Sequence, residues 1–161
     1  LTFIWSKYEG ETPQPQDYDE LDKEFLERIK SIPDAVGTEI ERNELSKGLG
    51  RIIEFSAFCN QYFQKKQPWS DKEKAKTALH LCVNAVHGLS ILLEPYIPFS
   101  AEKLWQQLNL PGSVHEQRWA SVSELKIQNR HRINRPTVLF QRIPDEIIEE
   151  ERRRLHKSQA S

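Results

Sequence analysis

One stretch of the chain is apolar on nearly every side of the helix that it predicts. Between residues 71 and 94 the apolar side chains occupy all faces of the helical period rather than a single stripe. Pro68 precedes this stretch and Pro95 follows it, so the predicted helix is confined to the interval between them. A helix that is apolar all round must be buried among other elements. The sequence therefore predicts a bundle with this helix at its centre.

The rest of the chain predicts helices with one apolar face, which suits the outer members of a bundle. Pro33 and Gly37 are expected to interrupt and kink one of them, and Ser100 is expected to cap a later short helix. Residues 137–140 read as a short extended segment after Pro136. The predicted fold is an all-α bundle with a short extended C-terminal segment. Its helices span about residues 1–8, 17–43, 44–66, 71–94 and 101–108, with a charged helix from 145 onward.

A bend between two predicted helices carries the most distinctive side chain, Trp69. Pro68 ends the first helix, and Ser70 with Glu73 has the spacing of a capping box that starts the second. The lysines near this bend are Lys65, Lys66, Lys72 and Lys74. An indole held at a helix N-terminus among lysines suits a base that stacks on the ring and phosphates that meet the cations. The alternative is that Trp69 plugs the top of the bundle, as most tryptophans are buried for packing.

Asn60 is a polar residue at the edge of the apolar face of the helix before the bend. A polar side chain in that place needs hydrogen-bond partners. It either bridges to the next helix and stiffens the bend, or it contacts a ligand directly. We favour the first interpretation, because Asn60 lies more than two turns, about 13 Å along the axis, from Trp69.

Several kinds of chemistry find little support in the sequence. Lys and Arg number 23 against 24 Asp and Glu, so any RNA contact must come from local patches. His80 and His87 share a helix face but lie about 10.5 Å apart along the axis, too far for one metal ion, and are expected to be polar groups satisfied within the bundle. The two cysteines suit a reduced protein, and no transmembrane segment or protected acid–base pair is apparent. We therefore predict no catalysis, no metal site and no membrane contact for this piece alone.

Three segments resemble one family of enzymes. Asn60-x-Tyr62-x₅-Pro68-Trp69, the run from Glu94 to Trp105, and Arg135-Pro136-Thr137-Val138-Leu139-Phe140-Gln141-Arg142-Ile143 occur in the order seen in methionyl-tRNA synthetases of the archaeal type. The resemblance covers essentially the whole chain. It implies the anticodon-binding helical bundle of a class I aminoacyl-tRNA synthetase, an enzyme that joins methionine to its tRNA using ATP.

The resemblance implies a role for two residues of the bend. Trp69 stacks on an anticodon base and Pro68 shapes the turn. From the pattern of the bend itself we add Lys65 and Lys66 as contacts to tRNA phosphate, and Asn60, Tyr62, Ser70 and Glu73 as supports of the site. Other class I synthetases, for valine, isoleucine or leucine, share the first motif loosely, and a purely structural helical interaction module is the remaining alternative.

The resemblance also implies how this chain relates to the whole enzyme. Residues 1–126 form the bundle, whose first helix begins upstream of Leu1, and residues 127–161 form the return segment and a charged helix. ATP with Mg²⁺, zinc and catalysis belong to a catalytic part absent from this chain. The expected partners are tRNA and that catalytic domain, in the cytoplasm. The basic run Arg130, Arg132 and Arg135, and also Arg142, is expected to point toward the catalytic body and to have a lesser role in binding the anticodon.

Overall fold

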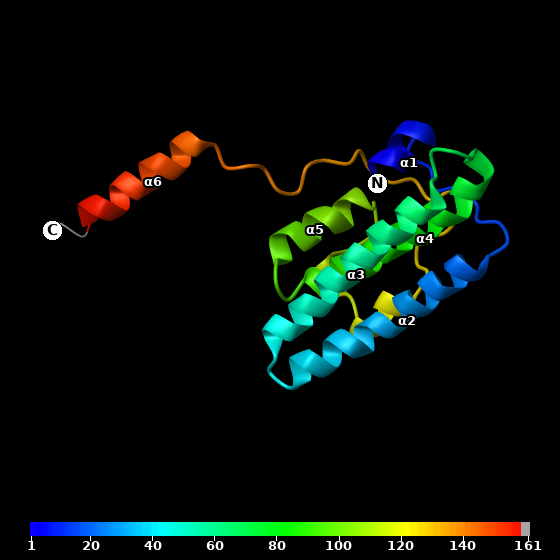
Figure 1. Ribbon diagram of the computed structural model, residues 1–161, viewed down its shortest axis with the longest axis horizontal. Coiled ribbons are helices and arrows are strands. Elements are labelled where there is room, and N and C mark those ends of the chain that lie inside the picture. Colours follow the sequence, from blue (N-terminus) through cyan, green and yellow to red (C-terminus); the bar gives the residue numbers. More distant parts are fainter. Residues whose placement is uncertain (159–161) are drawn as a thin grey trace.

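The computed structural model describes residues 1–158, and the side chains of all of these except Lys74 and residues 156–158. Figure 1 shows a bundle of long antiparallel helices, with a C-terminal helix set apart from it at the end of an extended segment. The elements are α1 (Thr2–Lys7), α2 (Glu20–Glu41), α3 (Leu45–Lys66), α4 (Lys72–Leu93), α5 (Pro98–Gln107), the short 3₁₀ turns η1 (Val114–Glu116) and η2 (Trp119–Ser123), and α6 (Asp145–Ser158). The predicted all-α bundle is confirmed.

Helix α4 is the centre of the bundle, as its apolar pattern predicted. It packs against α2, α3, α5 and both 3₁₀ turns. By length and composition alone, Ala75–Leu93 could also cross a membrane, but 72% of this stretch is buried by the rest of the protein. Burial of this kind is what the core helix of a bundle requires.

Two hydrophobic clusters pack against α4, one on each side. The larger cluster lies among α2, α3, α4 and α5 and includes Phe25, Phe55 and Trp105. The smaller cluster joins α4 to α1 and to the segment that follows η2, through Ile4 and Ile127 among others. The second cluster therefore fastens the N-terminal helix and the return segment to the same end of the bundle.

Helix α2 is continuous through the two residues that were expected to interrupt it. Pro33 is buried within the helix, and its carbonyl accepts a hydrogen bond of 2.9 Å from the indole Nε1 of Trp119. Gly37 leaves room for the same indole, because a Cβ there would lie 3.2 Å from Nε1. The helix runs unbroken from Glu20 to Glu41 with Trp119 packed across this part of it, so the predicted interruption is wrong.

The start of α5 also differs from the prediction. The helix begins at Pro98, with Ile97 rather than Ser100 before it. Proline suits the first turn of a helix because its φ is already helical and the missing N–H has no partner there. Just before this helix, the Tyr96 hydroxyl donates to the Leu45 carbonyl at 3.0 Å and occupies the space where Gly48 has no side chain.

A buried amide ties the return segment to α4. Asn84 is fully buried and accepts from the Ile127 backbone N–H at 2.8 Å, while its Nδ2 donates to the Ile127 carbonyl at 3.0 Å. Ile133 is buried as well, so the packed bundle continues past the expected boundary at residue 126. Figure 1 shows the chain leaving the bundle as an extended segment before α6, and the Asn134 side chain still donates to the Gln106 carbonyl at 2.7 Å.

Beyond this point the chain is largely exposed. Residues 137–140 form no strand with any described segment, although Gln107 Nε2 donates to the Thr137 carbonyl at 3.1 Å. In α6 the predicted pair of Glu150 and Arg154 is present at 2.8 Å, whereas Glu149 lies nearest to Arg152, at 3.9 Å. Such exposed pairs add only a few tenths of a kcal/mol each.

Two buried histidines lack a partner on one ring nitrogen. His80 and His87 are both buried, and no described group hydrogen-bonds the Nδ1 atom of either ring. The prediction that both rings are satisfied is therefore wrong for these atoms. Burial lowers the pKa of His87 to about 4, with a smaller contribution from the positive charge of Lys126. The ring lies against Trp105, with ring centroids 5.6 Å apart, and is neutral in the folded protein at neutral pH.

We predict that His87 makes the protein less stable in mild acid. Unfolded histidine takes up a proton near its ordinary pKa of about 6.5, whereas folded His87 does so only near pH 4. The unfolded state therefore binds more protons between these values, and stability falls as the pH is lowered from about 6.5 to 4. The difference amounts to roughly 3 kcal/mol over this range.

Denaturant unfolding at several pH values measures this effect. His87→Gln keeps a polar side chain of similar size without the titration, so its free energy of unfolding should depend less on pH in this range. Parallel pH profiles for the two proteins would contradict the prediction.

Candidate nucleic-acid interface

The bend after α3 is a tight turn over residues 67–70. Gln67 has a left-handed backbone with φ of 43°, and the Ser70 N–H donates to its carbonyl at 2.9 Å. Pro68 occupies the second position of the turn, where its fixed φ is suitable, and it is buried. Trp69 is placed at the third position by this geometry.

The predicted capping box of Ser70 and Glu73 does not form. The Ser70 hydroxyl donates to the Gln67 carbonyl at 2.8 Å and so closes the turn, while α4 begins at Lys72. The Glu73 N–H instead donates to the Asp71 carboxylate at 2.9 Å. Glu73 uses its own side chain for Lys76 and for Gln16, which lies in the loop before α2. The cap has moved one residue along the chain because Ser70 is needed within the turn.

Trp69 is presented to solvent. Its side chain is 55% exposed, so the alternative in which it plugs the bundle is wrong. One edge of the indole rests near Phe63, with centroids 6.0 Å apart and planes at 59°, and Phe63 in turn meets Phe3 of α1 edge-on at 6.0 Å. These ring contacts support the indole, and its exposed surface is available to stack on a flat ligand.

A buried carboxylate fixes the end of α3 that leads into the bend. Asp22, on the first turn of α2, is 1% exposed and accepts from the Tyr62 hydroxyl at 2.5 Å and from Lys66 Nζ at 2.8 Å. The Tyr62 ring stacks on Phe25 at 3.9 Å, which aligns its hydroxyl with Asp22. Burial and the neighbouring Asp22 raise the pKa of Tyr62, so the phenol remains a donor. Tyr62 thus braces the end of α3 that leads into the bend.

The two lysines at the end of α3 have different environments. Lys66 has a side chain only 9% exposed and pairs with Asp19 at 2.8 Å as well as with Asp22. Burial alone would lower the pKa of Lys66, but the hydrogen bonds to these two carboxylates raise it. Lys65 is exposed and pairs with no described residue. Lys66 is therefore a structural cation, and the expectation that it meets phosphate is corrected, whereas Lys65 is available.

The remaining residues of the predicted site are placed as follows. Asn60 is exposed, and its side chain hydrogen-bonds no residue that the structure describes, so the expected bridge to the next helix is wrong. It lines an apolar groove of about 310 Å³ together with Cys59, Phe63 and Cys82. Both cysteines are free, and burial raises the pKa of the Cys59 thiol to about 12. Lys72 is exposed beside the turn, and the side chain of Lys74 lies outside the described residues.

A match to a protein family indicates what kind of ligand this domain binds. Residues 22–157 match the family described as the anticodon-binding domain of tRNA ligase. The chain belongs to this family. Its members are RNA-binding parts of larger enzymes, which agrees with an exposed indole at a braced turn.

Curated relatives of this anticodon-binding domain are methionine–tRNA ligases. The ligase of Methanosphaera stadtmanae is 37% identical over 97% of this chain, and that of Pyrococcus abyssi is 35% identical over 92% of it. The chain spans only 25% and 20% of these relatives' lengths. The crystal structure of the apo form of Mycobacterium tuberculosis methionyl-tRNA synthetase has a TM-score of 0.79, covering 89% of this chain and 30% of that one, at 21% identity. That structure supports the fold.

Three features of this end of the domain were not anticipated from the sequence. Asp22 falls on the apolar face of α2 beside Phe25, and an acid in that position was a usable signal for a buried network. Tyr8 donates from its hydroxyl to the Lys72 carbonyl at 3.2 Å and so reaches the first turn of α4. Arg130 and Arg132 line a pocket together with Tyr8 of the N-terminal segment.

We predict that Tyr62→Phe destabilises the domain by about 1–3 kcal/mol, because the buried Asp22 carboxylate loses one of its hydrogen bonds and keeps the one from Lys66. The ring stack on Phe25 is retained, so the loss reports on the hydroxyl alone. The free energy of unfolding from urea titration measures it. Tyr96→Phe, which removes a hydroxyl bonded to one backbone carbonyl, serves as the matched control and should cost less. Equal losses in the two variants would contradict a special role for the Asp22 network.

Proposed function

We propose that this chain is the anticodon-binding domain of a methionine–tRNA ligase and that Trp69 stacks on a base of the tRNA anticodon. The observation that carries the proposal is the half-exposed indole on a turn whose supporting residues are buried and bonded. Stacking on an aromatic side chain contributes roughly 1–3 kcal/mol per base and tolerates any base. Trp69 therefore supplies affinity, and base-edge hydrogen bonds must supply selectivity.

The choice of methionine rests on the relatives. Those cited above are all methionine–tRNA ligases, and the order of the three sequence motifs agrees with them. A domain from a valine, isoleucine or leucine enzyme is the alternative within the same class. A purely structural interaction module is disfavoured by the exposed position of Trp69.

The whole enzyme is proposed to ligate methionine to tRNA with ATP in the cytoplasm, with this domain as the part that holds the anticodon. ATP with Mg²⁺, and zinc, are expected in the catalytic domain, the second proposed partner of this chain. Among the side chains that the structure describes, no three of His, Cys, Asp and Glu are grouped so as to hold a metal ion. The residues of this domain act by binding and orienting the tRNA, with Lys65 the proposed phosphate contact at the bend.

We predict that Trp69→Ala in the full-length enzyme lowers kcat/KM for aminoacylation by about 10–100-fold, equivalent to the loss of one base stack. The free energy of unfolding should fall by much less than the roughly 3–5 kcal/mol of a deleted core tryptophan, because the indole is half exposed. Steady-state kinetics and thermal melting on the same preparation measure both quantities.

Two matched variants and a second substrate sharpen this experiment. Trp69→Phe keeps a stacking ring and should retain much of the activity, whereas Trp69→Leu keeps the apolar bulk and should behave like the alanine variant. A minihelix without an anticodon arm should be charged equally poorly by all of these enzymes. A variant that melts much earlier yet charges full-length tRNA normally when folded would end the anticodon assignment for Trp69.

A further inference from the structure

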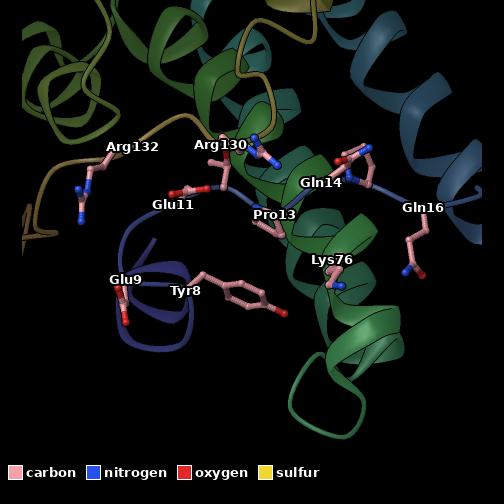
Figure 2. A pocket seen from close by; sticks show the side chains of 11 residues that line it. Tyr8, Glu9, Glu11, Pro13, Gln14, Gln16, Lys76, Arg130 and Arg132 are labelled. Carbon is pink, nitrogen blue, oxygen red and sulfur yellow. The ribbon is translucent and has the colours of Figure 1, made fainter.

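A polar pocket of about 520 Å³ lies at the same end of the domain as Trp69. Arg130, Arg132, Lys76 and Tyr8 line it, together with the carboxylates of Glu9 and Glu11. Figure 2 shows Arg130 and Arg132 on the two sides of Glu11, with the Tyr8 ring pointing across the pocket toward Lys76. The aromatic ring and the cations thus come from three segments that are far apart in the sequence.

Backbone pairing holds the two arginines in place. The segment 10–12 runs beside the segment 128–133: the Arg130 N–H donates to the Thr12 carbonyl at 2.8 Å, the Thr12 N–H donates to the His131 carbonyl at 2.8 Å, and Glu11 pairs with Arg132 as an antiparallel bridge. The Thr12 hydroxyl adds a bond of 2.6 Å to the Gln128 carbonyl. Arg130 has a left-handed φ of 61°, which this pairing maintains. The backbone is fixed, so the two guanidinium groups start from defined positions.

The two guanidinium groups have no partner among the described residues. Among the residues that the structure describes, neither Arg130 nor Arg132 forms an ion pair or a side-chain hydrogen bond, even though Glu9 and Glu11 are nearby. Lys76 is less available, since Glu73 binds its ammonium at 2.7 Å. Two unpaired guanidiniums offer planar donor groups that match phosphate oxygens better than an ammonium does. The pocket is therefore suited to an anionic ligand that carries phosphates.

The pocket is connected directly to the bend. Tyr8 bonds the carbonyl of Lys72, the first residue of α4, and Lys76 follows one turn later, about 6 Å along the axis. Figure 2 shows Lys76 just above the loop that precedes this helix. The first turn of α4 thus lies between the bend that carries Trp69 and the pocket that contains Arg130.

We propose that Arg130 and Arg132 form a second contact for the RNA that Trp69 holds, by binding its phosphate backbone in this pocket. The inference rests on the proposed function and extends it to residues that neither the motifs nor the relatives single out. Because phosphates are the same in every sequence, this contact positions the RNA and does not read it. Arg130 and Arg132 are therefore positioning residues.

The test is the salt dependence of RNA binding by the full-length protein. The probes are an RNA hairpin that carries the methionine anticodon and a second hairpin with one anticodon base changed. Arg130→Gln and Arg132→Gln should each flatten the plot of log affinity against log salt by about 0.7, the value for one phosphate contact in single-stranded RNA. Each should also raise Kd by roughly 3–10-fold at low salt, and by the same factor for both hairpins.

Arg42→Gln is the matched control. Arg42 is an exposed arginine at the turn between α2 and α3, the opposite end of the bundle from α1 (Figure 1). Its removal changes net charge equally but should leave the salt slope unchanged. Arg130→Lys keeps both the charge and a non-glycine residue at this left-handed position, so it should retain most of the slope. Arg132→Gln keeps the test valid if the Arg130 variants fold less well.

The outcomes separate this inference from the function on which it rests. Unchanged slopes for the arginine variants, with weaker binding by Trp69→Ala, would overturn the second contact and leave the anticodon assignment intact. A pocket that serves an acidic protein partner would give that same result. If Trp69→Ala bound both hairpins normally, the arginines would no longer share an RNA with Trp69, and both proposals would fail.

Discussion

The buried carboxylate of Asp22 is the interaction on which the geometry of the bend depends. It joins the first turn of α2 to the last turn of α3 through the Tyr62 hydroxyl and the Lys66 ammonium. A carboxylate in an apolar core is costly unless it is paired and hydrogen-bonded, and here both conditions are met by side chains from the helix that ends at the turn. The left-handed residue Gln67 follows at once, so the direction in which the chain leaves α3 is set by this network.

A second buried polar group does the same for the other half of the site. Asn84, in the middle of α4, uses both its carbonyl and its amide on the backbone of Ile127. This pair anchors the segment that then runs beside the loop after α1 and carries Arg130 and Arg132. Helix α4 thus positions two surfaces. Its N-terminus lies beside Trp69, and the Asn84 side chain at its middle holds the segment that carries Arg130 and Arg132. Satisfied buried polar groups of this kind specify one arrangement of chain segments where apolar packing alone would tolerate several.

The sequence was sufficient for the existence of the main helices, because hydrophobic periodicity reports directly on burial, although Pro33 did not interrupt α2 as expected. The start and end of α3 and α4 agree with the prediction to within about two residues. The exposed indole at the bend was also among the predicted alternatives. The sequence could not identify partners that are distant along the chain. Lys65 and Lys66 are adjacent lysines with no difference in the sequence, and only the ion pairs of Lys66 with Asp19 and Asp22 distinguish them. Ser70 likewise had the spacing of a helix cap, but its hydroxyl donates to the Gln67 carbonyl within the turn instead.

Overall charge is a poor guide to RNA binding here, because some cations of the bundle pair locally with carboxylates and others do not. Lys23, Lys30 and Lys47 each pair with a glutamate three residues earlier on a solvated helix face. Such pairs contribute little stability, but they remove positive charge from the field that a polyanion experiences. The cations without a described partner at the end that bears Trp69 include Lys65, Lys72, Arg130 and Arg132. A chain with a net charge of −1 can therefore present a locally basic end, and the strength of RNA binding depends on which cations are left unpaired and not on their total number.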